Sequence, residues 1–350
     1  MTVEAPTPTP AQVRKKLRRR RSGDRSQALR RAFQYAFLAL NVWIGVEFYL
    51  FVRFYESGGQ SVFARRPPGV EGWLPIASLM NLKVWLLTGI IPRLHPAGMF
   101  LLIAFVLISF VFRKTFCSWL CPVGTLSEWL WNLGRQTFGR NVRLPRWVDV
   151  PLRGLKYLLL GLFLYAVLSM PVEGIRAFLN GPYGVVADVK MLNFFRYLGM
   201  GGAVTVALLV LLSVFIQNFW CRYLCPYGAL FGLVGLFSPA RIRRDTRTCI
   251  DCSKCAKACP SQLPVDKLVE IRSAECTACM MCVAVCPAEG ALHLSLPKRR
   301  RIPEWAMAAG IALLFLGVCG WARWTGHWST DLPIRVYMEL VPRASEFTHP

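Results

Sequence analysis

The 350-residue chain is 54% hydrophobic and only 17% charged, and its apolar residues fall in long uninterrupted blocks. Such blocks exclude a set of soluble domains and predict an α-helical membrane protein, with the lipid bilayer as a partner. The 42 Lys and Arg against 19 Asp and Glu give a net charge of +23, and the basic residues flank the apolar blocks. The positive-inside rule accounts for this placement, which argues against nucleic acid as a partner.

Residues 1–31 are predicted to form a basic cytoplasmic arm, with its charge concentrated between Arg14 and Arg31. The pair Arg30-Arg31 before an apolar run is faintly similar to a twin-arginine export signal. No small-residue cleavage site follows the pair. We therefore interpret the arm as a basic flank that holds the N-terminus of the first span inside.

Five apolar blocks are long enough to be predicted membrane spans: 33–52, 95–112, 156–172, 198–217 and 304–321. A sixth block, 74–91, is interrupted by Asn81 and Lys83. If this block does not cross, three segments are left inside and contain 31 of the 42 Lys and Arg: 1–31, 113–156 and 222–301. If it crosses, most basic residues lie outside. The positive-inside rule therefore predicts a re-entrant or interfacial segment.

The expected fold is an α-helical polytopic membrane protein with about five spans, one re-entrant or interfacial segment and an inserted α+β two-cluster ferredoxin module. Its parts are the basic arm 1–31, the membrane domain 32–240, the cytoplasmic ferredoxin module 241–297, the last span 303–321 and the periplasmic tail 322–350. The alternating pattern of residues 291–296 fits the last strand of the module. Pro303 is expected to open the last span, and Lys298 to Arg301 to anchor the module's exit at the membrane.

One motif occurs twice, 104 residues apart. It reads Phe-Cys-Ser-Trp-Leu-Cys-Pro at 116–122 and Trp-Cys-Arg-Tyr-Leu-Cys-Pro at 220–226. Each copy ends a predicted span that arrives from the same side, and each is followed by an apolar stretch suited to a short interfacial helix, at 125–134 and 229–237. Parallel repeats of this kind tend to build a site on their shared axis.

The most specific motif lies at 249–286. A run with the spacing C-x2-C-x2-C-x3-C-P is followed, after a 16-residue interval, by a second run with the same spacing. In this pattern the first three cysteines of a run bind one [4Fe-4S] cluster, and the fourth reaches the other cluster. We therefore predict one cluster on Cys249, Cys252, Cys255 and Cys286. The second is predicted on Cys276, Cys279, Cys282 and Cys259. Zinc ribbons use similar C-x2-C pairs but need no such doubled run.

Two C-x3-C-P motifs at span ends, followed by a two-cluster ferredoxin module, resemble the NapH/NosR/CcoG group of membrane-bound polyferredoxins. The resemblance covers about residues 33–297. It implies an electron-transfer protein of the bacterial cytoplasmic (inner) membrane, and an electron carrier or a subunit of an oxidoreductase system rather than a stand-alone enzyme. The resemblance to NapH-like members implies that quinol is the electron donor. CcoG-like members imply a cupric reductase or metal-centre assembly factor, which is the alternative function.

Two departures from the group leave the redox partner protein and the direction of electron flow open. The outside segments are too short for the flavin-carrying domain of NosR-like members. The tail 322–350 is too short for the large C-terminal domain of CcoG-like members. The tail itself is a possible docking segment for a periplasmic partner, although no motif identifies one.

The two C-x3-C-P motifs supply four cysteines to a shared site: Cys117, Cys121, Cys221 and Cys225. On a helix, cysteines four residues apart share a face, so the repeat brings both pairs together. Arg113, Lys114 and Arg222 lie nearby in sequence and are expected to favour thiolate over thiol. Three interpretations stay open: a metal site for copper(I) or an additional iron–sulfur centre, a redox dithiol pair, or buried cysteines without a redox role.

A quinol site is expected within the spans or near one membrane face. Glu47 lies inside the first span, where a carboxylate is costly, and His95 at an outer boundary can accept a proton near neutral pH. Lys83 is the third candidate. Each also has a structural interpretation: an interhelical hydrogen bond for Glu47, a helix-end position for His95 and snorkelling for Lys83.

Other cofactors find no support in the sequence. There is no C-x-x-C-H motif, no Gly-rich dinucleotide fingerprint and no Walker loop, and only four histidines. We therefore expect no haem, no bound NAD and no covalent flavin. Cys319 has no cysteine partner near it in sequence and is expected to be a small packing residue of the last span.

Overall fold

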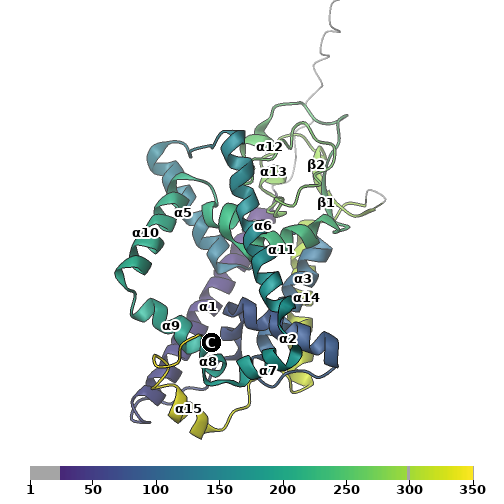
Figure 1. Ribbon diagram of the computed structural model, residues 1–350. Helices are drawn as coiled ribbons and strands as arrows, with labels where there is room; N and C mark the ends of the chain where they lie inside the picture. Colours follow the sequence, from purple (N-terminus) through teal and green to yellow (C-terminus); the bar gives the residue numbers. More distant parts are fainter. Residues whose placement is uncertain (1–23, 298–299, 350) are drawn as a thin grey trace, which may run out of the picture.

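The computed structural model describes residues 24–297 and 300–349, and it is mostly helical (Figure 1). Most of the predicted arm 1–31 and part of the predicted anchor at Lys298 to Arg301 lie outside the described residues. In Figure 1, the ferredoxin module sits at one end of a bundle of helices, and α15 (Ile334–Leu340) sits at the opposite end. The side of a membrane that each end faces stays a prediction.

Among the described residues, three helices are long and apolar enough to cross a membrane: α1 (Ser26–Glu56), α6 (Arg146–Ser169) and α14 (Glu304–Trp324). A fourth span results if α9 (Ala187–Arg196) and α10 (Met200–Phe215), which meet at 81°, are counted together. The structure thus has three to four candidate spans where the sequence predicts about five.

Part of the difference lies in α3 (Pro96–Phe112), which is apolar but only 17 residues long. It is buried over most of its length, with α2 (Pro75–Thr88), α11 (Pro226–Leu236), α14 and the 3₁₀ helix η1 (Pro68–Trp73) packed around it. A helix that is apolar on all sides suits such a central position. In the sequence, a helix buried in the centre of the bundle and a membrane span therefore look alike, because both are long apolar blocks.

The remaining helices connect these elements. α2 occupies the block predicted to be re-entrant, and at 14 residues it is shorter than a full span. The others are α4 (Phe116–Trp119), α5 (Pro122–Phe138), α7 (Val172–Asn180), α8 (Pro182–Val185), the π-helical turn η2 (Trp220–Leu224), α12 (Lys254–Lys257) and α13 (Met281–Ala284). As predicted, α14 begins directly after Pro303.

The two copies of the sequence repeat exchange partners. α5, which follows the first C-x3-C-P motif, packs against α10, which precedes the second motif. α11, which follows the second motif, packs against α3, which precedes the first. Helices are thus present in both stretches where the sequence suggests them. Because each of these helices packs against the helix that precedes the other motif, the two motifs lie close to each other.

The ferredoxin module contains a two-stranded antiparallel sheet. β1 (Arg241–Arg244) pairs with β2 (Leu292–Ser295), so that Arg241 lies opposite Ser295. β2 confirms the strand expected at 291–296. Buried side chains of the module, such as Ile242 and Leu294, belong to the same hydrophobic core as α3. This continuous core fixes the module on the helical bundle.

The tail after α14 folds back on the far end of α1. The ring of Tyr337 in α15 lies 5.3 Å from that of Phe51 and 5.6 Å from that of Tyr55, measured between centroids. Tyr337, Phe51 and Tyr55 are all buried. Much of this tail is therefore committed to packing.

Candidate electron-transfer site

Each predicted set of cluster ligands lines a pocket of its own. One pocket is lined by Cys249, Cys252, Cys255 and Cys286. Another is lined by Cys259, Cys276, Cys279 and Cys282. These are the two groups expected from the crossed ferredoxin spacing, with the fourth cysteine of each run placed among the first three of the other. Four thiols are the donor set that a [4Fe-4S] cluster takes, so the chemistry of each group fits such a cluster.

The backbone of both cysteine runs curls in the same way. Asp251 and Ser253 in the first run have φ of +54°, and the equivalent Ala278 and Met280 in the second have φ of +45° and +61°. Side-chain-bearing residues adopt this left-handed conformation at a cost, and such strain concentrates at functional sites. Its repetition at equivalent positions makes each run wrap around its pocket.

The two ligand sets differ in exposure. In the first set, Cys252 is exposed, Cys249 and Cys286 are half-buried, and Cys255 is buried. In the other set, Cys259, Cys276 and Cys282 are buried, and Cys279 is half-buried. The pocket of Cys249 to Cys255 therefore faces the outside of the module, whereas the second pocket lies toward the helical bundle.

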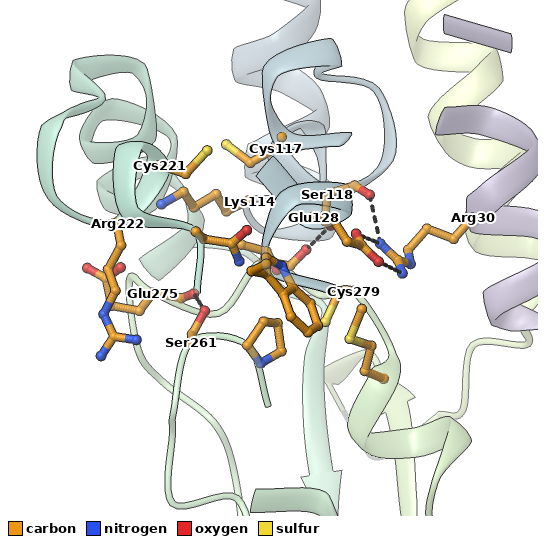
Figure 2. Close-up of a pocket in the computed structure, with 16 residues that line it drawn as sticks. Arg30, Lys114, Cys117, Ser118, Glu128, Cys221, Arg222, Ser261, Glu275 and Cys279 are labelled. Atoms are coloured by element: carbon orange, nitrogen blue, oxygen red, sulfur yellow. Dashed lines mark hydrogen bonds and ion pairs between the residues drawn. The ribbon is translucent and has the colours of Figure 1, made fainter. Parts of the chain in front are cut away.

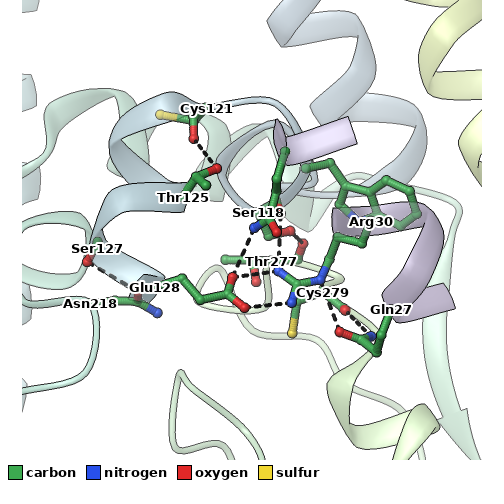
Figure 3. A network of polar contacts seen from close by, with 12 residues as sticks. Gln27, Arg30, Ser118, Cys121, Thr125, Ser127, Glu128, Asn218, Thr277 and Cys279 are labelled. Carbon is green, nitrogen blue, oxygen red and sulfur yellow. Dashed lines mark hydrogen bonds and ion pairs between the residues drawn. The ribbon is translucent and has the colours of Figure 1, made fainter. Parts of the chain in front are cut away.

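The loop that carries Cys276, Cys279 and Cys282 is fastened to the first C-x3-C-P motif by hydrogen bonds. Ser118 Oγ donates to the carbonyl of Thr277 at 2.7 Å, and Trp119 Nε1 donates to that of Ala278 at 3.4 Å. The start of α1 contributes a third contact, from Gln27 Nε2 to the carbonyl of Cys279 at 2.9 Å. Ser118, Thr277, Gln27 and Cys279 meet in the network of Figure 3.

Buried charged side chains, whose contacts the sequence does not predict, stabilise this junction. Arg30 makes a bidentate ion pair with Glu128 of α5, at 2.6 and 2.7 Å, and is 1% exposed (Figure 3). Arg113 donates to the carbonyls of Ile271 and Ser273, both at 2.6 Å. In the sequence, Arg30 and Arg113 stand out only as charges beside apolar blocks, and Glu128 as a charge inside the apolar stretch 125–134.

The four cysteines of the C-x3-C-P motifs come together. Cys117, Cys121, Cys221 and Cys225 lie close enough for each thiol to interact with the charge of the other three. Among the described residues, no three His, Cys, Asp or Glu side chains converge as the ligands of a single metal ion. The arrangement brings four sulfur donors into one region, as expected from the repeat.

The predicted helical geometry of the motif is wrong in one respect. Cys117 lies in α4, which ends at Trp119, and Cys121 is the residue before α5. Likewise, Cys221 lies in η2, and Cys225 precedes α11. Proline at the first position of α5 and α11 favours this break because it has no backbone N–H to continue a helix. A turn, and not a shared helix face, joins the cysteines of each pair.

A glycine in each copy allows the turn to close. A Cβ atom on Gly124 would lie 2.2 Å from the carbonyl oxygen of Cys117. A Cβ on Gly228 would lie 3.0 Å from the carbonyl oxygen of Cys221. The functional motif is therefore C-x3-C-P-x-G, with the glycine required because the backbone passes so near.

Of the three cations expected to favour thiolate at these cysteines, Lys114 lowers the pKa of three of the thiols as expected, but burial has the larger, opposite effect. Burial raises the pKa of Cys117 to about 12 and of Cys121 to about 11, although Lys114 opposes the shift at Cys117. Arg113 and Arg222 are engaged elsewhere, and Arg222 pairs with Asp149 at 2.8 Å. The unligated thiols are protonated at neutral pH, so binding of a metal or cluster must release protons.

Lys114 occupies a small pocket between the four thiols and the ferredoxin module. Figure 2 shows it beside Cys117 and Cys221, with Glu275 and Cys279 on the module side. The Lys114 side chain is 3% exposed. A buried cation at this place lowers the cost of negative charge on the sulfurs around it.

A much larger apolar cavity reaches the same thiols from the other side. Its volume is about 1220 Å³, and all four C-x3-C-P cysteines line it. Aromatic and aliphatic side chains such as Trp43, Leu101 and Phe105 form much of its wall, and Glu47 and Arg323 contribute charged groups. A site of this kind accommodates a large apolar ligand held by a few polar contacts.

The three candidate quinol residues are separated in the structure. Glu47 lines the large cavity. Lys83 instead donates to the carbonyls of Val167, Leu168 and Met170 at 3.2, 2.9 and 2.5 Å, and so caps the end of α6. The structural role of Lys83 is therefore to cap α6, and not to snorkel toward the membrane surface as the sequence suggested.

His95 lies in a buried polar network at the far end of the bundle. Its Nε2 lies 2.9 Å from the carbonyl oxygen of Gly184, and its Nδ1 lies 3.1 Å from a guanidinium nitrogen of Arg66. Arg66 also pairs with Glu71 at 2.6 Å and Asp188 at 2.7 Å. His95 is 1% exposed and does not line the large cavity, which fits its structural interpretation as the residue that begins α3.

Comparisons with known proteins agree with the cysteine motifs. A family model described as a 4Fe-4S binding domain matches residues 94–141 and 198–244, which contain the two C-x3-C-P motifs. A second, described as a 4Fe-4S dicluster domain, matches residues 241–287. No solved structure gives a significant match.

Related proteins are named for ferredoxin-type electron transport. YccM of Escherichia coli (strain K12), whose name assigns it to electron transport, is 49% identical over 326 residues, which are 91% of each chain. The ferredoxin-type protein NapH of the same organism is 27% identical over 52% of this chain and 62% of its own. The methylamine utilization ferredoxin-type protein MauN of Paracoccus denitrificans is 32% identical over 42% of this chain and 48% of its own. The chain belongs to the NapH-type polyferredoxins and is a ferredoxin-type electron transport protein with 4Fe-4S domains.

Proposed function

We propose that this protein relays electrons between quinol in the large apolar cavity and a cytoplasmic redox partner. The path would run through a redox centre on the four C-x3-C-P thiols and then through two [4Fe-4S] clusters. The bound centres would supply one-electron chemistry, while the protein ligates, buries and orients them. The protein would lie in the bacterial inner membrane, with the ferredoxin module in the cytoplasm.

One observation carries the proposal: the large cavity, the small pocket of Lys114 and the pocket of Cys259, Cys276, Cys279 and Cys282 form a series in which each pocket shares a wall with the next. Cys117 and Cys221 line both the large cavity and the small pocket of Lys114. Cys279 lines that small pocket and also the pocket of the buried cluster ligands. Cys282 of this set interacts electrostatically with Cys255 of the exposed set. Each step of the proposed path therefore joins neighbouring groups.

The residues of the large cavity have distinct roles in this proposal. The apolar wall would hold the ring and chain of the quinol and exclude water. Glu47, half-buried in the wall, would accept a proton as the quinol is oxidised. Lys83 and His95 then serve structure, because their polar atoms are engaged away from the cavity.

The test is quinol-dependent reduction of the clusters in lipid nanodiscs, followed by electron paramagnetic resonance. Leu159→Trp would fill part of the cavity, because Leu159 lines it. Leu158→Trp is the matched control, because Leu158 is the preceding residue of α6, is 59% exposed and does not line the cavity. We expect Leu159→Trp to slow reduction by quinol at least tenfold, and Leu158→Trp to leave it unchanged.

Reduction by dithionite is measured in the same samples, because it bypasses the cavity. The proposal is supported if dithionite reduces the clusters of all variants equally and only the reduction of Leu159→Trp by quinol is slowed. Clusters that dithionite reduces and quinol does not would exclude quinol as the donor. Stoichiometric copper binding that Cys117→Ser and Cys221→Ser abolish would favour the alternative of a cupric reductase or metal-centre assembly factor.

A further inference from the structure

Exposed basic side chains lie in the segments of the chain that carry the exposed cysteine set. Four basic side chains are exposed in this part of the module, and we call them the basic rim: Arg247, Lys254, Lys257 and Lys267. Lys254 lines the pocket of Cys249, Cys252, Cys255 and Cys286. Lys267 follows Asp266, which also lines this pocket and accepts a hydrogen bond from Ser253 at 2.7 Å.

Within the described part of the chain, the nearby carboxylates do not form ion pairs with the basic rim. Asp251 pairs with Arg244 at 3.1 Å, Asp266 accepts from Ser253, and Asp245 accepts from the backbone of Arg247 at 2.9 Å. No side chain of the basic rim forms an ion pair with the rest of residues 24–297 or 300–349. Their charge is available to a molecule that approaches the pocket from outside.

We propose that the basic rim is the docking surface for an acidic soluble electron-carrier protein, which exchanges electrons with the cluster on Cys249, Cys252, Cys255 and Cys286. The inference rests on the proposed presence of a cluster at that site. One electron leaves the reduced member of the pair and one enters the oxidised member, and no bond is made or broken. The other ligand set is covered by the bundle, so the exposed set is the entry or exit point for a soluble partner.

Long-range attraction explains why charge is useful here. A patch of one sign steers an oppositely charged partner to the exposed cluster and raises the association rate, and the effect falls steeply with ionic strength. The positive-inside rule also makes the inner face of the protein basic in general. A test must therefore separate the basic rim from the other cations of that face.

The experiment measures binding and electron transfer between the full-length protein, in nanodiscs of zwitterionic lipid, and an acidic bacterial two-[4Fe-4S] ferredoxin. The variant is Lys254→Glu/Lys257→Glu. The control is Arg135→Glu/Arg140→Glu, which makes the same charge change at exposed positions around the end of α5, outside the module. Binding is measured by calorimetry with the oxidised ferredoxin, and electron transfer by stopped-flow absorbance, from low to high salt.

We expect Lys254→Glu/Lys257→Glu to raise the Kd for ferredoxin by about tenfold or more at low salt, and the control to change it by less than about twofold. The rate of electron transfer between ferredoxin and the wild type should fall as salt is added. Basic cytochrome c should bind Lys254→Glu/Lys257→Glu more tightly than the wild type. Equal effects of both double variants, or a rate independent of salt, would overturn the docking surface. Iron content and dithionite-reducible signals identify separately any failure of the cluster itself, and Lys254→Gln/Lys257→Gln repeats the test without introducing negative charge.

Discussion

Lys156 of α6 and Glu275 of the ferredoxin module form a buried ion pair, with Nζ 2.6 and 2.8 Å from the two carboxylate oxygens. Lys156 is fully buried, and Glu275 directly precedes Cys276. The pair therefore connects a candidate membrane span with the loop that carries Cys276, Cys279 and Cys282.

Glu275→Gln should destabilise this junction strongly, because it leaves the Lys156 ammonium buried without its partner. Loss of one member of a buried ion pair costs about 3–5 kcal/mol. Thermal unfolding in detergent, followed by loss of the visible absorbance of the clusters, should show a lower midpoint. Lys156→Met/Glu275→Gln should recover part of the loss, and a double variant less stable than Glu275→Gln would contradict this account.

Lys114 should raise the reduction potential of any anionic centre on the four C-x3-C-P thiols. Its ammonium interacts with Cys117, Cys221 and Cys225, and it is buried. Lys114→Met removes the cation, so addition of an electron becomes less favourable and the potential should fall by tens of millivolts, on the order expected for one partly screened charge. Redox titration followed by electron paramagnetic resonance measures the shift. Lys114→Arg keeps the charge and should stay nearer the wild-type potential.

The sequence predicts local features of this protein well. Short spacings divide eight cysteines into two predicted ligand sets, and two pockets of the structure contain the same two groups of cysteines. The strand at 291–296 and the helix after Pro303 follow from alternation and proline chemistry. In each case the residues that determine the feature lie close together in the chain.

The long-range features could not be predicted in the same way. Arg30 and Glu128 are 98 residues apart, and Lys156 and Glu275 are 119 apart, so no local pattern pairs them. Hydropathy alone does not distinguish the buried helix α3 from a span. The proton-accepting chemistry of His95 is compatible with many sites, and only its contacts with Arg66 and Gly184 place it in a structural network.

The Glu71 carboxylate should make the far end of the bundle sensitive to acid. Burial by itself would raise the pKa of Glu71. The charge of the Arg66 guanidinium and the other polar neighbours outweigh burial, and the pKa falls from 4.5 to about 2. The ionised form is favoured in the folded state, so this stabilisation is complete above about pH 4.5 and is lost as the pH falls toward 2. Glu71→Gln should cost on the order of 3 kcal/mol at neutral pH.

Unfolding measured from pH 7 to pH 3 tests this effect. The difference in stability between the wild type and Glu71→Gln should shrink as the pH falls. Glu339→Gln is the control, because Glu339 is exposed in α15 and should give the same stability as the wild type throughout. A difference between wild type and Glu71→Gln that is constant over this range would contradict the assignment.

Gly124→Ala should disrupt the first C-x3-C-P-x-G turn and with it the four-thiol site. The new Cβ would lie 2.2 Å from the carbonyl oxygen of Cys117, a distance that requires the backbone to move. Gly228→Ala should be milder, because its nearest contact is 3.0 Å. Gly154→Ala in α6 is the matched control: a Cβ there has no neighbour within 4 Å, and alanine favours a helix by about 1 kcal/mol over glycine. Thiol-alkylation rates under reducing conditions, of Cys117 for the first turn and of Cys221 for the second, measure the opening of each turn without depending on cluster loading. We expect alkylation to be fastest in Gly124→Ala, slower in Gly228→Ala, and equal to the wild-type rate in Gly154→Ala. Equal rates in all three variants would show that the glycines have no role in closing the turns.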